Sequence, residues 1–256
     1  MLLENGSMPS GHRSRYGGHM ATVVLVHGAM HGGWAWSPVA RILRSRGHEV
    51  HTPTLTGQGE RRAGLTPEVG VQTHVDDLTE LLWFEDLHDV VLVLHSYAGV
   101  LAGPVVERCA ERLRQVVFAG AFTARPGQSL ADVEPPAVAE RYRELAAGDG
   151  DGWRVPATTA FLAQWAVTDP RLQAFVGPRL TDFPLKSVTD AVDYDPGPLL
   201  ALPRVYLEHT APPLPSLAAS MAAALADGAA HRTIATGHDM MLADPDGTAD
   251  LLGELL

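Results

Sequence analysis

The sequence predicts an α/β fold: a mostly parallel, six-stranded sheet with helices on both faces and an inserted helical lid. Three observations lead to this prediction. Short apolar runs rich in valine alternate with helical patterns from Ala21 onward, as in chains whose parallel strands are joined by helices. The run at 90–95 (VVLVLH) is almost wholly apolar, which is typical of a central strand buried on both faces. The interval 124–200 has no strong strand signal and is too long for a connecting loop.

The individual elements follow from local patterns. Six segments are expected to be strands: 22–27, 49–52, 90–95, 115–120, 203–208 and 231–235. Residues 73–86 carry valine and leucine at the spacing of one helical stripe. Helices are also expected over 97–112 and 214–227. A last helix is expected to open at Asp244-Pro245, where a polar cap precedes a proline in the first turn.

The interval 124–200 is expected to form the lid, and 21–123 together with 201–256 the α/β core beneath it. Pro135-Pro136 and the glycine-rich run at 148–152 separate its helical pieces. Its aromatic residues are candidates to roof a pocket, with the alternative that they only hold the lid together. These residues are Trp153, Phe161, Trp165, Phe175, Phe183 and Tyr194.

Composition excludes several classes of function. The 256 residues suffice for one large α/β domain or for two small ones. The formal net charge of −11 disfavours nucleic acid and anionic membrane surfaces as partners. No apolar run approaches the roughly 20 residues that cross a bilayer. The single cysteine, Cys109, excludes an internal disulfide and a multi-cysteine metal site. We therefore expect a cytoplasmic protein without a metal, whose partner is a small-molecule substrate. A homodimer is left open.

The first 20 residues read differently from the rest. They are rich in Gly, Ser, His and Arg and have no sustained apolar region, so they do not form a secretory signal. The closing Gly-His-Met is typical of the residue of a cleaved tag, which would make Met20 the natural start. A leader outside the fold is the alternative.

Ser96 is the candidate nucleophile. It follows the buried run 90–95 directly, and a helix is expected to begin at once, so its hydroxyl would be exposed on a tight, strained turn at the carboxyl end of the sheet. Such a turn needs small neighbours two residues before and after the serine. Ala98 fits that requirement, whereas Leu94 departs from it. A serine that only caps a helix is the alternative.

The loop after the first strand is the candidate oxyanion site. His27-Gly28 ends the strand, and small residues follow that let the backbone approach a ligand closely. We expect the backbone N–H groups of Ala29 and Tyr97 to stabilise a developing oxyanion. His27 and His31 are expected to hold this loop, because no third metal ligand lies nearby in the sequence.

His238 is the candidate general base. It stands in a loop between the last expected strand and the last helix, where it would take the Ser96 proton and return it to the leaving group. A surface histidine is the alternative. The serine loop, the oxyanion loop and the histidine loop in this chain order make a coincidence improbable.

These motifs resemble one branch of the α/β-hydrolases. HGAMHGGW at 27–34, TPTLTGQGER at 52–61 and HSYAG at 95–99 are similar to bacterial esterases related to plant methyl-salicylate esterases and hydroxynitrile lyases. PRLTDFPLK at 178–186 and TGHDMML at 236–242 fit the same branch. The resemblance spans nearly the whole chain from Met20, and it implies the α/β-hydrolase fold and an enzyme without a cofactor.

Two positions depart from the hydroxynitrile lyases in this branch. Those enzymes carry a threonine after the first-loop histidine and a lysine after the catalytic histidine, where this chain has Gly28 and Asp239. Cyanohydrin cleavage is therefore disfavoured, because no fixed cation would stabilise the departing cyanide.

The acid of the triad is absent from both usual positions. The family's aspartate would fall near Pro212, and the other common location offers only Gly120-Ala121-Phe122. Glu208, at the end of the strand 203–208, is the nearest substitute. Either Glu208 orients His238, or the enzyme works as a Ser-His dyad.

The preferred function is a serine-dependent carboxylic-ester hydrolase for a small to medium apolar substrate. The alternatives are a lyase or cyclase that uses the Ser-His pair to move protons, and a non-catalytic receptor. The expected pocket residues lie in the oxyanion loop, the lid and the two loops nearest the site: Gly28, Met30, Phe122, Phe161, Trp165 and Met240.

Overall fold

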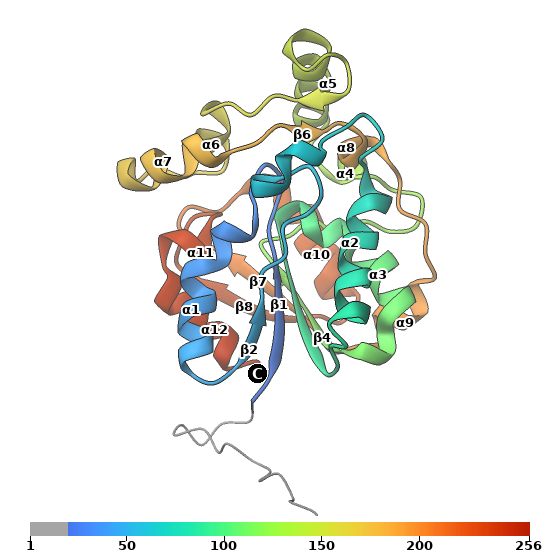
Figure 1. The fold of residues 1–256 in the computed structure, drawn as a ribbon, viewed down its shortest axis with the longest axis vertical. Coiled ribbons are helices and arrows are strands. Elements are labelled where there is room, and N and C mark those ends of the chain that lie inside the picture. The colour runs from blue at the N-terminus through green and yellow to red at the C-terminus, as the bar shows by residue number, and fades with distance from the viewer. Residues whose placement is uncertain (1–19) are drawn as a thin grey trace, which may run out of the picture.

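One parallel sheet organises the computed structural model, which describes residues 20–256 (Figure 1). Its strand order is β2-β1-β3-β4-β7-β8. The strands are β1 (Thr22–Val26), β2 (Glu49–His51), β3 (Val90–His95), β4 (Leu113–Ala119), β7 (Arg204–His209) and β8 (Ala230–Ile234). All six coincide with predicted segments, which confirms the predicted fold class. The prediction for the leader concerns residues that, apart from Met20, lie outside the described part.

The core lies around β3. Every residue of β3 is buried, and the strand pairs in parallel with β1 on one side and β4 on the other. Strands buried on both faces need apolar side chains on both, which explains the unbroken Val-Leu run. This arrangement places the carboxyl end of β3 at the centre of the upper rim of the sheet (Figure 1).

Helices cover both faces of the sheet. They are α1 (Ser37–Ser45), α2 (Val71–Phe84), α3 (Ala102–Cys109), α10 (Ala218–Ala226), α11 (Met240–Ala243) and α12 (Pro245–Gly253). Helices α1 and α12 pack together on one side, and α2 and α3 on the other (Figure 1). The last helix begins as predicted, because the Asp244 side chain accepts a hydrogen bond from the Gly247 N–H.

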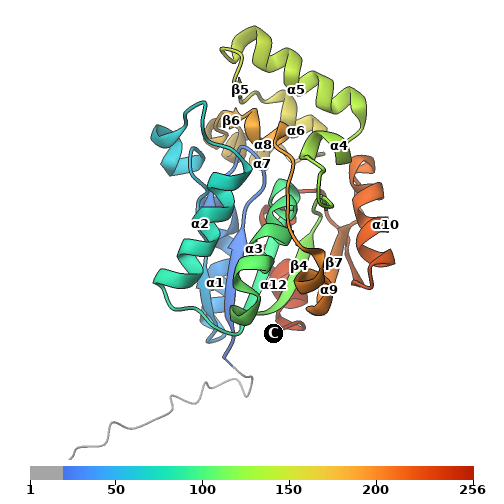
Figure 2. The ribbon, with the colours of Figure 1, turned by 90° about the vertical axis from the view of Figure 1, so that its right-hand side faces the viewer.

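The interval 124–200 is helical, with one short exception. Its helices are α4 (Leu130–Val133), α5 (Pro136–Asp149), α6 (Ala160–Gln164), α7 (Pro170–Val176), α8 (Lys186–Thr189) and α9 (Pro196–Ala201). The exception is an antiparallel pair, β5 (Arg154–Val155) with β6 (Phe183–Pro184), which is too short to leave an alternating pattern in the sequence. Helices α4 to α8 lie beyond the carboxyl ends of the strands, whereas α9 packs on α3 (Figures 1 and 2).

The two chain segments that begin and end the predicted lid, residues 124–200, are tied to each other. The Gly127 N–H donates to the Val192 carbonyl at 2.7 Å, and the Val192 N–H donates to the Gln128 carbonyl at 2.8 Å. The Tyr194 hydroxyl donates to the Ala124 carbonyl at 2.9 Å. The Tyr194 ring lies so close to Gly103 of α3 that a Cβ there would be 2.3 Å from it. We call residues 124–128 with 192–194 the neck of the lid.

No helix in the described part of the chain is both long and apolar enough to cross a bilayer.

Candidate active site

Ser96 lies on a strained turn at the end of β3. Its φ is +54°, a backbone conformation that non-glycine residues rarely adopt, and it opens the 3-10 turn Ser96–Leu101. Tight packing holds the turn. A Cβ on Gly28 would lie 2.7 Å from the Ser96 Cβ, and a Cβ on Gly99 would lie 2.2 Å from the Phe122 carbonyl oxygen. The strained turn is therefore held by close packing that only glycine allows at positions 28 and 99.

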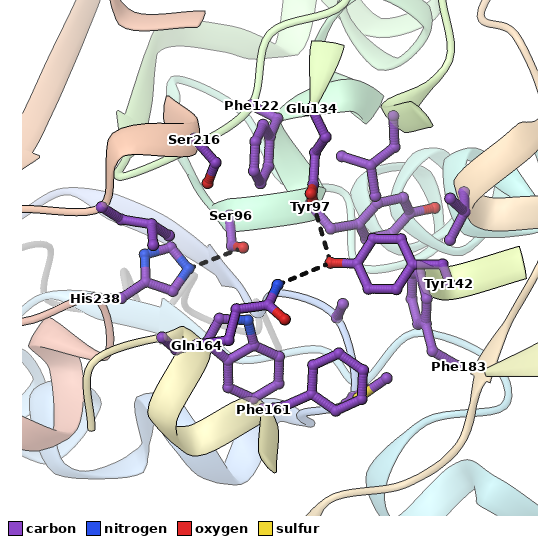
Figure 3. Close-up of a pocket in the computed structure, with 16 residues that line it drawn as sticks. Ser96, Tyr97, Phe122, Glu134, Tyr142, Phe161, Gln164, Phe183, Ser216 and His238 are labelled. Carbon is purple, nitrogen blue, oxygen red and sulfur yellow. Dashed lines mark hydrogen bonds between the residues drawn. The ribbon is translucent and has the colours of Figure 1, made fainter. Parts of the chain in front are cut away.

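His238 contacts the serine as its sequence position predicted. It stands between β8 and α11, and its Nε2 lies 3.0 Å from the Ser96 Oγ (Figure 3). Burial lowers the pKa of His238 well below its usual value, and the neighbouring His95 ring lowers it further. The imidazole is therefore neutral at pH 7, which is the form that can accept the serine proton.

Glu208 does not orient His238, contrary to the prediction. Its Oε2 instead accepts a hydrogen bond from the Nε2 of His231 at 2.8 Å, on a partly exposed part of the sheet. Successive side chains of a strand point to opposite faces. The next residue, His209, faces the site, with its ring centroid 5.0 Å from that of His238. Among residues 20–256, the His238 Nδ1 has no hydrogen-bond partner.

A carboxylate that the sequence analysis did not assign lies directly after the base. Asp239 Oδ2 is 3.3 Å from the Nε2 of His31, and both side chains are 2% exposed. Burial is the largest single influence on Asp239 and opposes its ionisation, but the charge and hydrogen bond of His31, together with the nearby His238 and His95 rings, lower the Asp239 pKa to about 2. Burial likewise opposes protonation of His31, while the Asp239 charge raises the pKa of that ring. The two groups therefore form a buried ion pair.

This pair connects the oxyanion loop to the loop of the base. The His31 Nδ1–H donates to the Ala29 carbonyl at 2.8 Å, so the ring bridges Ala29 and Asp239. The Asp239 charge also raises the pKa of His238 against the larger effect of burial. Asp239 thus supplies the negative charge that stabilises a protonated His238, although the Nδ1 of His238 has no acceptor in the described residues.

The two predicted oxyanion donors flank Ser96. Tyr97 is the second residue of the turn Ser96–Leu101, where backbone N–H groups lack intrahelical acceptors. Its hydroxyl donates to the Nδ1 of His74 at 2.8 Å, which fixes the residue. Ala29 follows Gly28, which packs on the serine. In the described part of the chain, the Ala29 N–H donates to no protein acceptor.

A narrow cavity joins these groups to the lid. Four predicted pocket residues line it, namely Met30, Phe122, Phe161 and Trp165. The other two do not: Gly28 packs under Ser96, and Met240 is buried with its methyl group close to Gly120, below His238. Of the remaining lid aromatics, Phe183 lines the cavity, whereas Trp153, Phe175 and Tyr194 do not. The cavity is about 20 Å³, room for little more than a water molecule, so a substrate must displace lid side chains.

Three polar residues of the lid also line the cavity and were not predicted. They are Glu134, which directly follows α4, Tyr142 of α5 and Gln164 of α6 (Figure 3). Residues 20–256 contain no group of three or more His, Cys, Asp or Glu side chains arranged to hold a metal ion.

Comparison with known proteins identifies a family model that matches most of the chain and relatives that match less than half of it. The model of the alpha/beta hydrolase family matches residues 23–251. A carbendazim hydrolyzing esterase of Nocardioides sp. (strain SG-4G) is 43% identical over 119 residues, which cover 46% of this chain and 49% of that protein. Methyl jasmonate esterase 1 of Vitis vinifera is 34% identical over 114 residues, 43% of this chain and 42% of that protein. The matches thus span less than half the length of these relatives.

Solved structures share the fold. An extracellular alpha/beta-hydrolase from a Paenibacillus species superposes with a TM-score of 0.81, covering 91% of this chain and 98% of that one at 22% identity. This likeness concerns the fold alone. Together with the sequence relatives, it confirms the resemblance inferred from the motifs.

Proposed function

Because the chain belongs to the alpha/beta hydrolase family, we propose that it hydrolyses carboxylic esters through an acyl-enzyme on Ser96. The observation that carries the proposal is the 3.0 Å contact between the Ser96 Oγ and the His238 Nε2. A strained, buried serine next to a neutral imidazole is the arrangement that nucleophilic acyl transfer requires. Two relatives that are named as esterases favour the same reaction class.

The first step is acylation. The His238 Nε2 takes the Ser96 proton while the Oγ attacks the ester carbonyl carbon, and the carbonyl oxygen becomes an oxyanion between the N–H groups of Ala29 and Tyr97. When the tetrahedral intermediate collapses, the C–O bond to the alcohol breaks, and the protonated His238 gives the alkoxide its proton. The alcohol leaves, and the acyl group stays on the Oγ.

The second step is hydrolysis of the acyl-enzyme. A water molecule loses its proton to the His238 Nε2 and attacks the acyl carbon. The bond between that carbon and the Ser96 Oγ then breaks, the carboxylic acid leaves, and the proton from His238 restores the Ser96 hydroxyl. In both steps His238 carries a positive charge for a moment. With no acceptor on the Nδ1 among the described residues, the nearby Asp239 charge is the group that stabilises this cation. The enzyme therefore acts as a Ser-His dyad with electrostatic support.

Covalent labelling tests this mechanism. A serine-directed alkyl phosphonate should form one adduct, located on Ser96 by mass spectrometry of the digested protein. Ser96→Ala should remove the adduct, and Ser96→Ala and His238→Ala should each lower kcat on activated esters by at least about 10³-fold, because the two residues act as a unit. Absence of any adduct, with ester turnover at the background rate, would refute the proposal.

A second candidate is a proton-transfer reaction without hydrolysis, such as an elimination, cyclisation or retro-aldol cleavage. The observation that favours it is the His238 Nδ1 without a carboxylate partner in the described residues, since a weaker base suffices for such chemistry. The same dyad would then move protons on the substrate. This candidate predicts product formation without an acyl-enzyme, whereas hydrolysis predicts an acyl adduct on Ser96 that can be trapped with a slow ester.

A further inference from the structure

The lid side of the cavity carries a polar cluster within an aromatic wall. The Tyr142 hydroxyl of α5 donates to the Oε1 of Glu134 at 3.2 Å, and the Gln164 Nε2 of α6 donates to the same hydroxyl at 3.4 Å. Around this cluster the wall is aromatic: the Phe161 ring stacks on Trp165, with centroids 5.4 Å apart, and lies 6.1 Å from that of Tyr142. Figure 3 shows the cluster across the cavity from Ser96 and His238.

One oxygen of this cluster has no partner. The Glu134 side chain is 7% exposed, and in the described residues no donor reaches its Oε2. The Tyr142 hydroxyl cannot serve it, because its single proton is used on the Oε1. A buried acceptor without a donor costs free energy, so it marks a place where another group is to be bound. Burial raises the pKa of this carboxyl to about 7.

The position of Glu134 relates this acceptor to the substrate. Glu134 and Ser96 line the same cavity, so a molecule whose ester carbonyl lies at Ser96 extends toward the lid cluster. Once lid side chains are displaced, a flat ring would lie between Phe161 and Phe122, which both line the cavity, and the group at its far edge would meet the free oxygen. Above pH 7, where the Glu134 carboxyl is ionised, its free oxygen can accept a hydrogen bond from an N–H or O–H there but gains nothing from a methyl cap.

We propose that Glu134 is a specificity residue and that the preferred substrates are aromatic esters with an N–H or O–H donor on the part that faces the lid. The proposal rests on the proposed function, because it takes the reacting ester to lie at Ser96. It also refines the sequence-based expectation of an apolar substrate, since the cavity combines aromatic walls with one unfilled acceptor.

Matched ester pairs test the proposal. The probes are the methyl esters of 3- and 4-hydroxyphenylacetic acid and of 3- and 4-aminophenylacetic acid, each beside its O-methyl or N,N-dimethyl analogue. Unsubstituted methyl phenylacetate is the reference substrate, which measures ester hydrolysis without a donor on the ring. For at least one donor position we expect kcat/KM to exceed that of the capped partner by about 10- to 100-fold, the range for a hydrogen bond to a buried charged group.

Three variants test whether Glu134 causes the preference for donor-bearing esters. Glu134→Leu should abolish it, and Glu134→Gln, which keeps an acceptor for Tyr142, should reduce it and retain the fold. Glu140→Gln is the matched control: it changes a glutamate of the same lid segment whose side chain is 62% exposed, and it should leave the preference unchanged. Thermal unfolding of each variant shows whether the fold is retained.

Direct binding separates the two proposals. Titration calorimetry of the same compounds with Ser96→Ala measures affinity without turnover, and we expect the donor compounds to bind about 10- to 100-fold more tightly than the capped ones. Equal affinities for every pair, or a preference that persists in Glu134→Leu, would overturn the role of Glu134 even if the esters are hydrolysed. A donor preference in binding without any ester turnover would instead refute hydrolysis and leave the recognition intact.

Discussion

The two walls of the cavity are built in different ways. On the sheet side, backbone geometry fixes the reacting groups: the Ser96 turn has φ +54°, and Gly28 packs against it. On the lid side, Glu134, Tyr142 and Gln164 meet only through side chains from separate helices. We therefore assign the reaction to the sheet side of the cavity, whose backbone geometry tolerates little change. Substrate recognition is assigned to the lid side, where side chains can be substituted one at a time.

Disrupting the backbone packing around Ser96 should lower the activity more than any change of charge on the same wall. In Gly28→Ala the new Cβ would lie 2.7 Å from the Ser96 Cβ and 3.0 Å from the His95 Nδ1, so the oxyanion loop must move away. We expect kcat to fall by about 100-fold or more, the cost of misplacing one oxyanion donor. Gly148→Ala, in α5 with open space around it, is the control and should retain full activity. Activity of Gly28→Ala within three-fold of the wild type would contradict the account of this wall.

A change of charge on the same wall should have a smaller effect. Asp239→Asn removes the charge that supports protonated His238, and we expect kcat/KM to fall by about 10- to 100-fold. Because that charge raises the His238 pKa, its loss lowers this pKa, and the acid limb of the pH–rate profile should move to lower pH. Glu208→Gln, whose carboxylate binds His231 instead, should stay within about two-fold. A larger loss of kcat/KM in Glu208→Gln than in Asp239→Asn would instead support Glu208 as the orienting acid.

Acid should destabilise the sheet side, with the smallest expected effect. Burial lowers the pKa of His27 to about 3 and those of His74 and His95 to about 4, from an unfolded value near 6.5. Between these values the unfolded chain binds more protons, so stability falls as the pH falls below 6.5. Each of these histidines should lower the free energy of unfolding by on the order of 1 kcal/mol between pH 6 and 5. Urea unfolding at pH 5, 6, 7 and 8 measures this slope, to which these three histidines should contribute almost nothing above pH 7.

The lid responds to pH with the opposite sign. It contains no histidine in 124–200, and its Glu134 has a pKa raised to about 7 by burial. A raised carboxyl pKa contributes stability that is present at low pH and is lost as the pH rises from about 4.5 toward 7. Glu134→Gln should therefore steepen the acid-induced loss measured with urea. A pH dependence of the unfolding midpoint in Glu134→Gln that equals that of the wild type between pH 5 and 7 would contradict the assignment to Glu134.

The difference between the walls also explains what could be predicted from sequence. All six strands, Ser96 and His238 could be located, because a buried parallel strand and a strained turn each require particular residue types in order. Glu208 was misassigned because a shift of one residue along β7 turns a side chain to the other face, and His209 is the one that faces His238. Sequence position near a strand end cannot resolve that alternation.

Other site residues left no local signal. The pairing of Asp239 with His31 joins residues 208 positions apart, and nothing in either loop specifies its partner. The Glu134 cluster depends on how α5 and α6 pack over the cavity, and the glutamate itself is ordinary for the end of a short helix. Such contacts are set by tertiary packing and have no pattern in the sequence.

The neck of the lid has a consequence for how this protein can diversify. Since 124–128 and 192–194 bind each other, and Tyr194 rests on the α3 backbone at Gly103, the intervening stretch enters and leaves the fold at one point. That stretch also bonds to the core, where the Thr181 N–H donates to the Met30 carbonyl and the Gln58 Nε2 donates to the Asp182 carbonyl. Replacing it with the corresponding stretch of another enzyme of this fold would therefore exchange substrate range in a single event only if these contacts to the oxyanion loop and to Gln58 are kept.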